Sequence, residues 1–315
     1  MSTPCRVLFY GSPDFATPIL SALLDTPWRP LAVVTQPDRP AGRGRRLRPP
    51  AVKQLAAEHE IPAIQPERLR RRAAVAQIAA LQPDLQIVAA YGQLIPKSVL
   101  NLPRYGTLNV HASLLPRWRG AAPVSAAILR GDDETGATIM LVDETEDTGP
   151  ILKQRKTRIG ATEHAGSLSD RLALLGAELL VNTIPDWLDG AITPLPQDNQ
   201  LATRARRVEK SAGKIDWTQP ASQIARHIRA YTPWPGAMTR LDGESIRIAE
   251  AHEIDGPGSP PGRIIDTTDS IEVATGSGVL RITRLQRAGK REMSAEEFAR
   301  GVRALRDQRF DVESA

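Results

Sequence analysis

The sequence predicts an α/β protein in which a doubly wound, Rossmann-like parallel sheet is followed by a smaller C-terminal β-barrel (OB-like) domain. Three observations lead to this fold class. In residues 1–190, short apolar runs alternate with segments of helical periodicity, as expected of strand–helix–strand units. Residues 191–214 break that pattern with prolines, polar residues and positive charges. Short runs of alternating apolar and polar residues then follow, which is typical of antiparallel strands.

The elements of the first domain are expected in the order that such a sheet requires. Its strands, read from the apolar runs, lie at residues 6–10, 31–35, 85–90, 107–110 and 138–142. After the first strand, Ser12 is expected to cap a helix and Pro13 to occupy its first turn. Further helices are expected at residues 50–60, 73–81, 123–130 and 167–188.

The remaining elements place the domain boundaries. We expect a first domain at residues 1–190, a basic linker at 191–214 and a C-terminal domain at 215–315. In the C-terminal domain, a helix at residues 221–230 is expected to precede strands at 245–249, 271–275 and 279–283.

Bulk composition narrows the class of protein. The chain has 315 residues, of which 41% are apolar and 24% charged, as in soluble proteins with two domains. No secretion signal or long apolar stretch is present, which predicts a cytoplasmic protein. Cys5 is the single cysteine, so an internal disulfide is excluded and a packing role is expected. A formal charge of +5 and a pI near 9.6 favour a polyanionic partner without establishing one.

Asn109 and His111 stand two residues apart at the end of a predicted strand, so their side chains should share one face. An asparagine amide donates without titrating, and a histidine donates or moves a proton, which suits the tetrahedral intermediate of acyl transfer. The acidic loop at residues 143–150 follows another strand of the same sheet, and a carboxylate there would orient the imidazole. A structural histidine beside an acidic surface turn is the alternative.

Two basic clusters are candidates for nucleic-acid contact. The loop after the second strand carries Arg39, Arg43, Arg45, Arg46 and Arg48 among glycines and prolines. Guanidinium groups there can bind phosphate in bidentate fashion or stack on bases. The linker carries a second cluster, which includes Arg207 and Lys210. Solvated charge runs are the alternative for both.

Several common motifs are missing. Gly11-Ser12-Pro13 stands where a dinucleotide-binding protein would have its glycine-rich turn. The sequence has no phosphate-binding loop, and its five histidines and one cysteine do not have metal-site spacing, so no metal is expected.

With these motifs in place, the chain resembles the methionyl-tRNA formyltransferases, a branch of the folate-dependent formyltransferases. Asn109-x-His111 runs into Ser113-Leu-Leu-Pro-Arg-Trp-Arg-Gly-Ala-Ala-Pro123, and Asp147-Thr-Gly follows. Thr35-Gln-Pro-Asp-Arg-Pro-Ala-Gly-Arg-Gly44 is similar to the family's tRNA-binding loop. Lys214-Ile-Asp-Trp217 and Arg229-Ala-Tyr-Thr-Pro-Trp-Pro-Gly236 extend the likeness into the C-terminal domain.

The resemblance implies substrates and site residues. Asn109, His111 and Asp147 are the implied catalytic residues, and 10-formyltetrahydrofolate is the implied formyl donor. The implied folate site is formed largely by backbone, from Tyr91, Gly92, Gln93, Leu94, Ile95 and Pro96, from Ser113, Leu114, Leu115 and Pro116, and from Asp143 and Glu144. Arg39, Arg43, Arg45, Arg46, Arg48, Arg207 and Lys210 are implied to bind initiator methionyl-tRNA, and the family suggests a monomer.

The sequence departs from the family pattern at two positions. Thr145 stands where the acidic loop usually has a glycine, which affects the expected backbone turn. Arg207 stands where lysine is common, which retains the charge and changes its hydrogen-bonding shape.

The expected reaction is direct attack of the methionyl amine on the formyl carbon, with Asn109 and His111 holding the oxyanion and Asp147 relaying protons. A folate-dependent formyltransferase acting on a sugar or nucleotide amine is the alternative. An alternative of another class is a non-catalytic tRNA-binding module.

Overall fold

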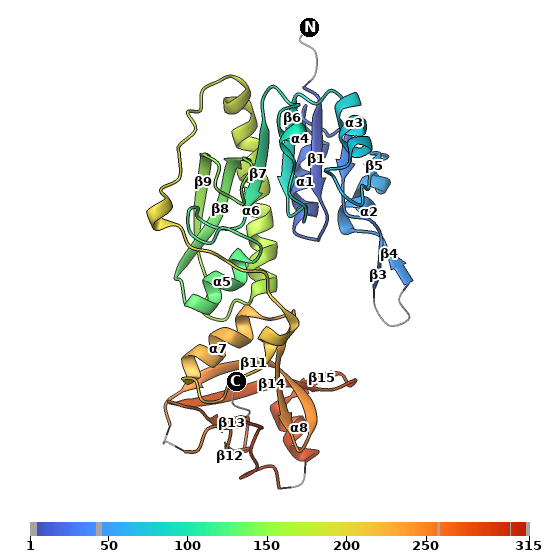
Figure 1. Ribbon diagram of the computed structural model, residues 1–315. Coiled ribbons are helices and arrows are strands. Elements are labelled where there is room, and N and C mark those ends of the chain that lie inside the picture. The colour runs from blue at the N-terminus through green and yellow to red at the C-terminus, as the bar shows by residue number, and fades with distance from the viewer. Residues whose placement is uncertain (1–4, 42–45, 257–258, 303, 313–315) are drawn as a thin grey trace. The chain divides into compact units, whose positions relative to one another are not determined.

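The computed structural model describes residues 5–41, 46–256, 259–302 and 304–312, which fold into two compact units (Figure 1). The first unit is drawn from the segments Met1–Pro123, Glu134–Arg158 and Ser169–Ala205. The second is drawn from Val124–Asp133, Ile159–Leu168 and Arg206–Ala315.

A mixed sheet forms the centre of the first unit, with the order β5-β2-β1-β6-β7-β8-β9 among the described strands. Its strands are β1 (Val7–Gly11), β2 (Ala32–Val34), β5 (Ala63–Ile64), β6 (Leu85–Ala89), β7 (Thr107–His111), β8 (Glu134–Leu141) and β9 (Ile151–Arg158). The strands from β5 to β7 in this order are parallel, whereas β8 pairs antiparallel with β7, and β9 with β8. The predicted α/β class is confirmed.

Strand β9 was missed by the sequence analysis. After Ile151 and Leu152 it continues with Lys-Gln-Arg-Lys-Thr-Arg, and most of these residues are exposed or half-buried. It is the edge strand of the sheet, so it needs few apolar residues, and a search for apolar runs does not find it.

Helices cover both faces of this sheet. Alternate residues of β1 point to opposite sides, with Val7 and Phe9 in one core and Leu8 and Tyr10 in the other. The first core is closed by α1 (Ala16–Leu24), α2 (Ala51–Glu58) and α6 (Ala165–Leu188). The second core is closed by α3 (Arg72–Ala80) and α4 (Lys97–Leu100).

The predicted capping role of Ser12 is wrong. Helix α1 begins at Ala16 with Phe15 at its N-cap position and has no side-chain cap. The Ser12 hydroxyl instead donates to the Tyr91 carbonyl oxygen at 3.2 Å and accepts from the Gln36 backbone N–H at 3.0 Å. It therefore joins the segments that follow β1, β2 and β6.

The arginine-rich segment, expected as a loop, contains a short β-hairpin. Strands β3 (Arg39–Ala41) and β4 (Arg46–Arg48) pair antiparallel, with Arg39 opposite Arg48. Residues 42–45 connect them and lie outside the described residues.

The second unit is built on an antiparallel sheet with the order β10-β11-β14-β13-β12, and β15 pairs with β14. Its strands are β10 (Ala237–Leu241), β11 (Glu244–Ile254), β12 (Ile264–Asp266), β13 (Ile271–Ala274), β14 (Val279–Arg287) and β15 (Glu292–Ser294). The named helices that lie wholly or mainly in it are α5 (Pro123–Arg130), η2 (Lys210–Gly213), α7 (Ala221–Ala230) and α8 (Ala295–Arg300). In its core, Trp217 stacks on Phe310 with ring centroids 5.1 Å apart.

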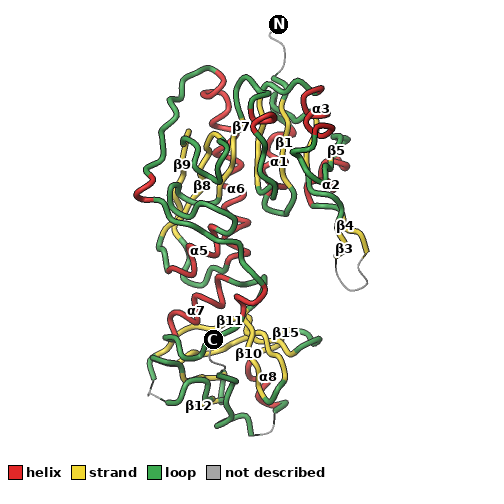
Figure 2. The backbone as a smooth tube through the Cα atoms, viewed as in Figure 1, coloured by secondary structure: helices red, strands yellow, loops and turns green. Residues whose placement is uncertain are grey.

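The segment after α6 is mostly irregular, and Figure 2 shows it as a loop with one short helical turn, η1 (Asn199–Leu201). It pairs with β9 through a bridge between Ile151 and Leu195. Among the described residues, no helix combines the length and the hydropathy needed to span a bilayer.

Candidate active site

Asn109 and His111 project from the same face of β7. They alternate with Leu108 and Val110, which point into the core on the opposite face. Period-two geometry therefore places both polar side chains together, as the sequence predicted. On the neighbouring strand β8, Met140 pairs with Asn109 and packs with Leu115 and Ile151.

Asp147 completes a cluster with these two residues. Its Oδ1 accepts from Asn109 Nδ2 at 3.3 Å, and its Oδ2 lies 3.6 Å from His111 Nδ1. The same Oδ2 accepts from the backbone N–H of Gly120 at 2.8 Å. Only 7% of the His111 side chain and 16% of the Asp147 side chain are exposed, so these contacts are largely shielded from water.

The contacts of His111 define which ring nitrogen carries a proton. Nε2 lies 2.9 Å from the carbonyl oxygen of Trp118, which can only accept, so Nε2 must carry a hydrogen. Nδ1 then faces Oδ2 of Asp147, so the carboxylate and the Trp118 carbonyl together orient the imidazole ring.

The path of the chain to Asp147 depends on the direction of β8, not only on its place in the sheet. Because β8 is antiparallel to β7, it ends beside the start of β7, where the Val142 N–H donates to the Thr107 carbonyl at 2.8 Å. The loop at residues 142–149 then returns across the sheet face. Asp147 itself has a left-handed backbone, with φ of 55°.

Thr145 fits this loop without a glycine. The positive φ falls at Asp147, and Thr145 has none. Its N–H and hydroxyl both donate to Asp143 Oδ1 at 3.0 Å, and its hydroxyl also contacts that of Thr148. The Thr145 hydroxyl therefore adds hydrogen bonds to this turn that a glycine could not make.

Comparison with known proteins identifies the family of the chain. A family model described as "Formyl transferase" matches residues 5–184, and one described as "Formyl transferase, C-terminal domain" matches residues 207–303. The chain belongs to the formyl transferase family. The family predicted from the sequence is confirmed.

Curated relatives resemble this formyl transferase over nearly its whole length. A methionyl-tRNA formyltransferase of Halorhodospira halophila is 51% identical over 95% of this chain and 97% of its own. One of Methylococcus capsulatus is 48% identical over 93% of this chain and 96% of its own.

Solved structures share the fold at low sequence identity. HypX from Aquifex aeolicus in complex with tetrahydrofolic acid matches 96% of this chain and 48% of its own, with a TM-score of 0.62 at 17% identity. An N-formyltransferase from Helicobacter canadensis, in complex with folinic acid and dTDP-3-aminofucose, matches 90% of this chain and 99% of its own, with a TM-score of 0.65 at 16% identity.

Two of the segments expected to bind folate are linked by an ion pair next to them. Lys97, directly after the first segment, forms a 2.6 Å ion pair with Glu144 of the acidic loop, and this bond raises the pKa of Lys97. Tyr91 and Ile95 are buried, whereas Leu94 is 75% exposed. The side chain of Gln93 bonds to the backbone of Pro66 and Leu69.

The expected folate segment at residues 113–116 is held by hydrogen bonds to neighbouring residues. Ser113 is fully buried and donates to the Arg117 carbonyl at 2.6 Å. The Leu115 N–H donates to the Thr138 hydroxyl at 3.2 Å. Leu114 and Pro116 are half-buried. The segment is thus fixed against β8, the strand next to the one that carries Asn109 and His111.

The arginine hairpin of the formyl transferase is exposed, and it is held at its root, which is Asp38 directly before β3. Arg46 and Arg48 are exposed, and Arg39 lies 4.0 Å from Glu67. At the root, Asp38 accepts from Gln65 at 2.7 Å and from Lys53 at 2.8 Å, and these bonds lower the pKa of Asp38. Arg43 and Arg45 lie outside the described residues.

The other two expected tRNA-binding residues, Arg207 and Lys210, are exposed in the second unit. The arginine hairpin belongs to the first unit.

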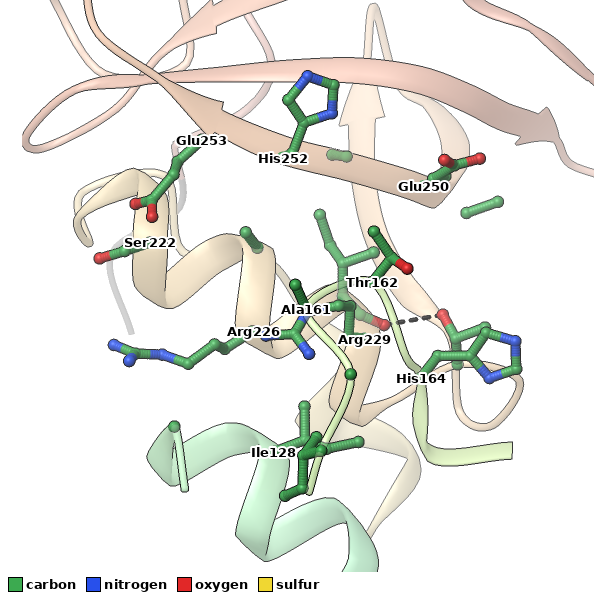
Figure 3. Close-up of a pocket in the computed structure, with 18 of the residues that line it drawn as sticks. Ile128, Ala161, Thr162, His164, Ser222, Arg226, Arg229, Glu250, His252 and Glu253 are labelled. Atoms are coloured by element: carbon green, nitrogen blue, oxygen red, sulfur yellow. Dashed lines mark hydrogen bonds between the residues drawn. The ribbon is translucent and has the colours of Figure 1, made fainter. Parts of the chain in front are cut away.

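A cavity of about 690 Å³ lies within the second unit, between α5, α7, β11 and the segment 159–164 (Figure 3). Arg226 and Arg229 of α7 line it, and burial together with the charge of Arg226 lowers the pKa of Arg229. Its lining residues are all in the second unit, whereas the cluster around Asp147 is in the first. Asn109, His111 and Asp147 therefore do not line this cavity.

Sequence reasoning missed the backbone groups of the cluster. The Gly120 N–H and the Trp118 carbonyl contact Asp147 and His111 directly. A backbone group carries no residue-type signature, so the only available signal was the position of both residues in the motif that follows His111.

Proposed function

We propose that this formyl transferase moves the formyl group of 10-formyltetrahydrofolate to the amino group of methionine carried on initiator tRNA. The observation that carries the proposal is identity of 48–51% to methionyl-tRNA formyltransferases over 93–95% of this chain. The match at residues 207–303 extends the likeness beyond the unit that holds the acyl-transfer groups. The N-formyltransferase from Helicobacter canadensis, solved in complex with dTDP-3-aminofucose, is similar in fold alone, at 16% identity.

In the proposed reaction, the neutral methionyl amine attacks the formyl carbon and forms a tetrahedral intermediate. The Asn109 amide carries two hydrogens, of which one donates to Asp147. We assign the other to the developing oxyanion. The oxyanion also replaces the Trp118 carbonyl as acceptor of the His111 Nε2–H.

The proton balance assigns a role to the His111–Asp147 pair. Formation of the new C–N bond makes the attacking nitrogen acidic, while N10 of the folate must gain a proton to leave. In the proposal, the pair takes the proton from the amine and returns one to N10, directly or through water. The products are formylmethionyl-tRNA and tetrahydrofolate, so no enzyme nucleophile is needed.

Binding of tRNA is assigned to exposed cations. Arg39, Arg46 and Arg48 of the hairpin present guanidinium groups suited to phosphate and to base stacking. We assign the same role to Arg43 and Arg45, and we assign phosphate contacts to Arg207 and Lys210. We further propose that the enzyme acts in the cytoplasm, where its substrates occur, and as a monomer, which light scattering would test.

Single-turnover transfer of labelled formyl tests the proposal, with methionyl initiator tRNA, methionyl elongator tRNA and free methionine as parallel acceptors. Label should appear chiefly on the initiator. Transfer to a sugar-nucleotide amine with none to tRNA would support the sugar alternative. Salt-sensitive tRNA binding without any transfer would support a binding module.

A further inference from the structure

Gln197, in the irregular segment after α6, forms two hydrogen bonds to the backbone of the loop that carries Asp147. Its Nε2 donates to the carbonyl oxygen of Asp147 at 2.9 Å and to that of Gly149 at 2.7 Å. These carbonyl oxygens belong to the two residues on either side of Thr148. Since Asp147 holds a left-handed backbone, an external hydrogen bond to this turn directly stabilises an otherwise unfavourable conformation.

Arg119 in turn holds Gln197. Its Nε donates to Gln197 Oε1 at 2.9 Å, and its Nη1 donates to Asn199 Oδ1 at 2.9 Å. Arg119 is only 7% exposed, so these charge-assisted bonds are shielded and strong. The next residue, Gly120, donates its N–H to Asp147 Oδ2. The segment 119–120 therefore holds Asp147 at its carboxylate directly and at its backbone through Gln197.

The same segment is paired with residues 203–205. The Arg119 N–H donates to the Thr203 carbonyl at 2.9 Å, and the Ala205 N–H donates to the Arg119 carbonyl at 2.8 Å. The Thr203 hydroxyl accepts from the Trp118 N–H at 2.9 Å. At Gly120, with φ of 109°, a Cβ atom would lie 2.7 Å from the Ala205 carbonyl oxygen, so the approach requires glycine.

We propose that Arg119 and Gln197 are positioning residues that hold Asp147 at its working distance from His111. Neither residue is assigned a contact with the reacting atoms. They act by fixing the turn at residues 147–149, on which the 3.6 Å separation of Asp147 Oδ2 from His111 Nδ1 depends. The inference rests on the proposed function, because its kinetic test is formyl transfer.

A matched pair of variants separates positioning from general stabilisation. In Gln197→Glu, the new carboxylate still accepts from Arg119, but it cannot donate to the two carbonyl oxygens and repels them. In Asn199→Asp, a carboxylate is likewise placed beside Arg119, but the Gln197 bonds to the loop remain. Both variants place one negative charge beside the same guanidinium, so they differ chiefly in the hydrogen bonds from residue 197 to the loop.

We expect Gln197→Glu to lower kcat by about 10- to 100-fold, because small misplacements of a catalytic group carry such losses. Its KM for 10-formyltetrahydrofolate should stay within about two-fold, its profile of kcat against pH should change shape, and Asn199→Asp should match the wild type. Equal kcat in the two variants, with both folded by circular dichroism, would overturn the inference.

Two further measurements cover the remaining outcomes. If Gln197→Glu does not fold, the second variant is Arg119→Lys, which retains the charge but loses the forked geometry of the guanidinium. This variant should also lower kcat, and a wild-type kcat in it would overturn the inference.

If the wild-type enzyme transfers no formyl group, the proposed function fails. The positioning role is then tested by the ring resonances of His111 in ¹H–¹⁵N spectra across pH. They should differ from wild type in Gln197→Glu and not in Asn199→Asp, and identical spectra would refute the role.

Discussion

The cluster around Asp147 and the arginine hairpin are held in opposite ways. The Asp147 carboxylate contacts Asn109, His111 and Gly120, and the cluster is largely buried. The hairpin side chains Arg46 and Arg48 are exposed, and the hairpin is secured mainly at Asp38. Catalysis of bond formation needs groups fixed to within a fraction of an ångström, whereas a polyanion can be bound by charged side chains that adjust their positions to it. Substitutions in the two regions should therefore affect different kinetic constants.

The largest effect is expected from Asn109→Ala, which removes the proposed oxyanion donor. We expect kcat to fall by about 10²- to 10³-fold, while KM for the folate stays within a few-fold. Asn101→Ala, at an exposed asparagine beyond α4, is the control and should behave as wild type. Near-normal kcat in Asn109→Ala would remove Asn109 from the proposed mechanism.

The double variant Arg46→Ala/Arg48→Ala should act on tRNA binding instead. We expect KM for initiator tRNA to rise about ten-fold at physiological salt, with kcat at saturating tRNA retained. The slope of log affinity against log salt concentration should decrease by about one for each phosphate that the variant no longer binds. Arg155→Ala, at an arginine of β9 paired with Glu178, is the matched control. A lower kcat with unchanged KM would contradict the division between the two regions.

A smaller effect is expected at the root of the hairpin. Asp38→Asn removes the charge that binds Lys53, so KM for tRNA should rise by about two- to three-fold through looser placement of the hairpin. Because the pKa of Asp38 is lowered, this anchor is present above the ordinary carboxyl pKa of 3.8 and is lost only as pH falls through the lower folded value. Asp14→Asn, at an exposed position, serves as control, and equal KM in both variants would show that the root does not position the hairpin.

The smallest effect on formyl transfer is expected at Cys5. Burial, with a contribution from Asp84, raises the pKa of its thiol from 9.0 to about 11. At pH 8 its thiolate fraction should be about 10²-fold below that of an ordinary thiol, so alkylation by iodoacetamide should be slower to a similar degree. Mass spectrometry measures the alkylation rate of Cys5, and the rate for glutathione serves as the reference for an ordinary thiol. Fast alkylation with loss of formyl transfer would assign Cys5 a role near the reaction.

Much of the site could be predicted from the sequence because it depends on local geometry. Asn109 and His111 had to share a face once residues 107–110 were expected as a strand, since side chains alternate along any strand. Exposure of Arg39, Arg46 and Arg48 could be expected, since the glycines, prolines and charges around them cannot form a core. The missing dinucleotide motif after β1 was equally visible.

Tertiary structure decided how the parts meet. The apolar run at residues 138–142 indicated a strand but not its direction, and the antiparallel pairing of β8 makes Asp147 return across the sheet. Ser12 has the residue type of a helix cap, but neighbouring strands place Tyr91 and Gln36 within its reach. Strand direction and backbone contacts depend on pairings between distant residues, for which a single sequence carries no local periodic signal. The sequence alone therefore determined which groups were available, and the fold determined which of them meet at Asp147.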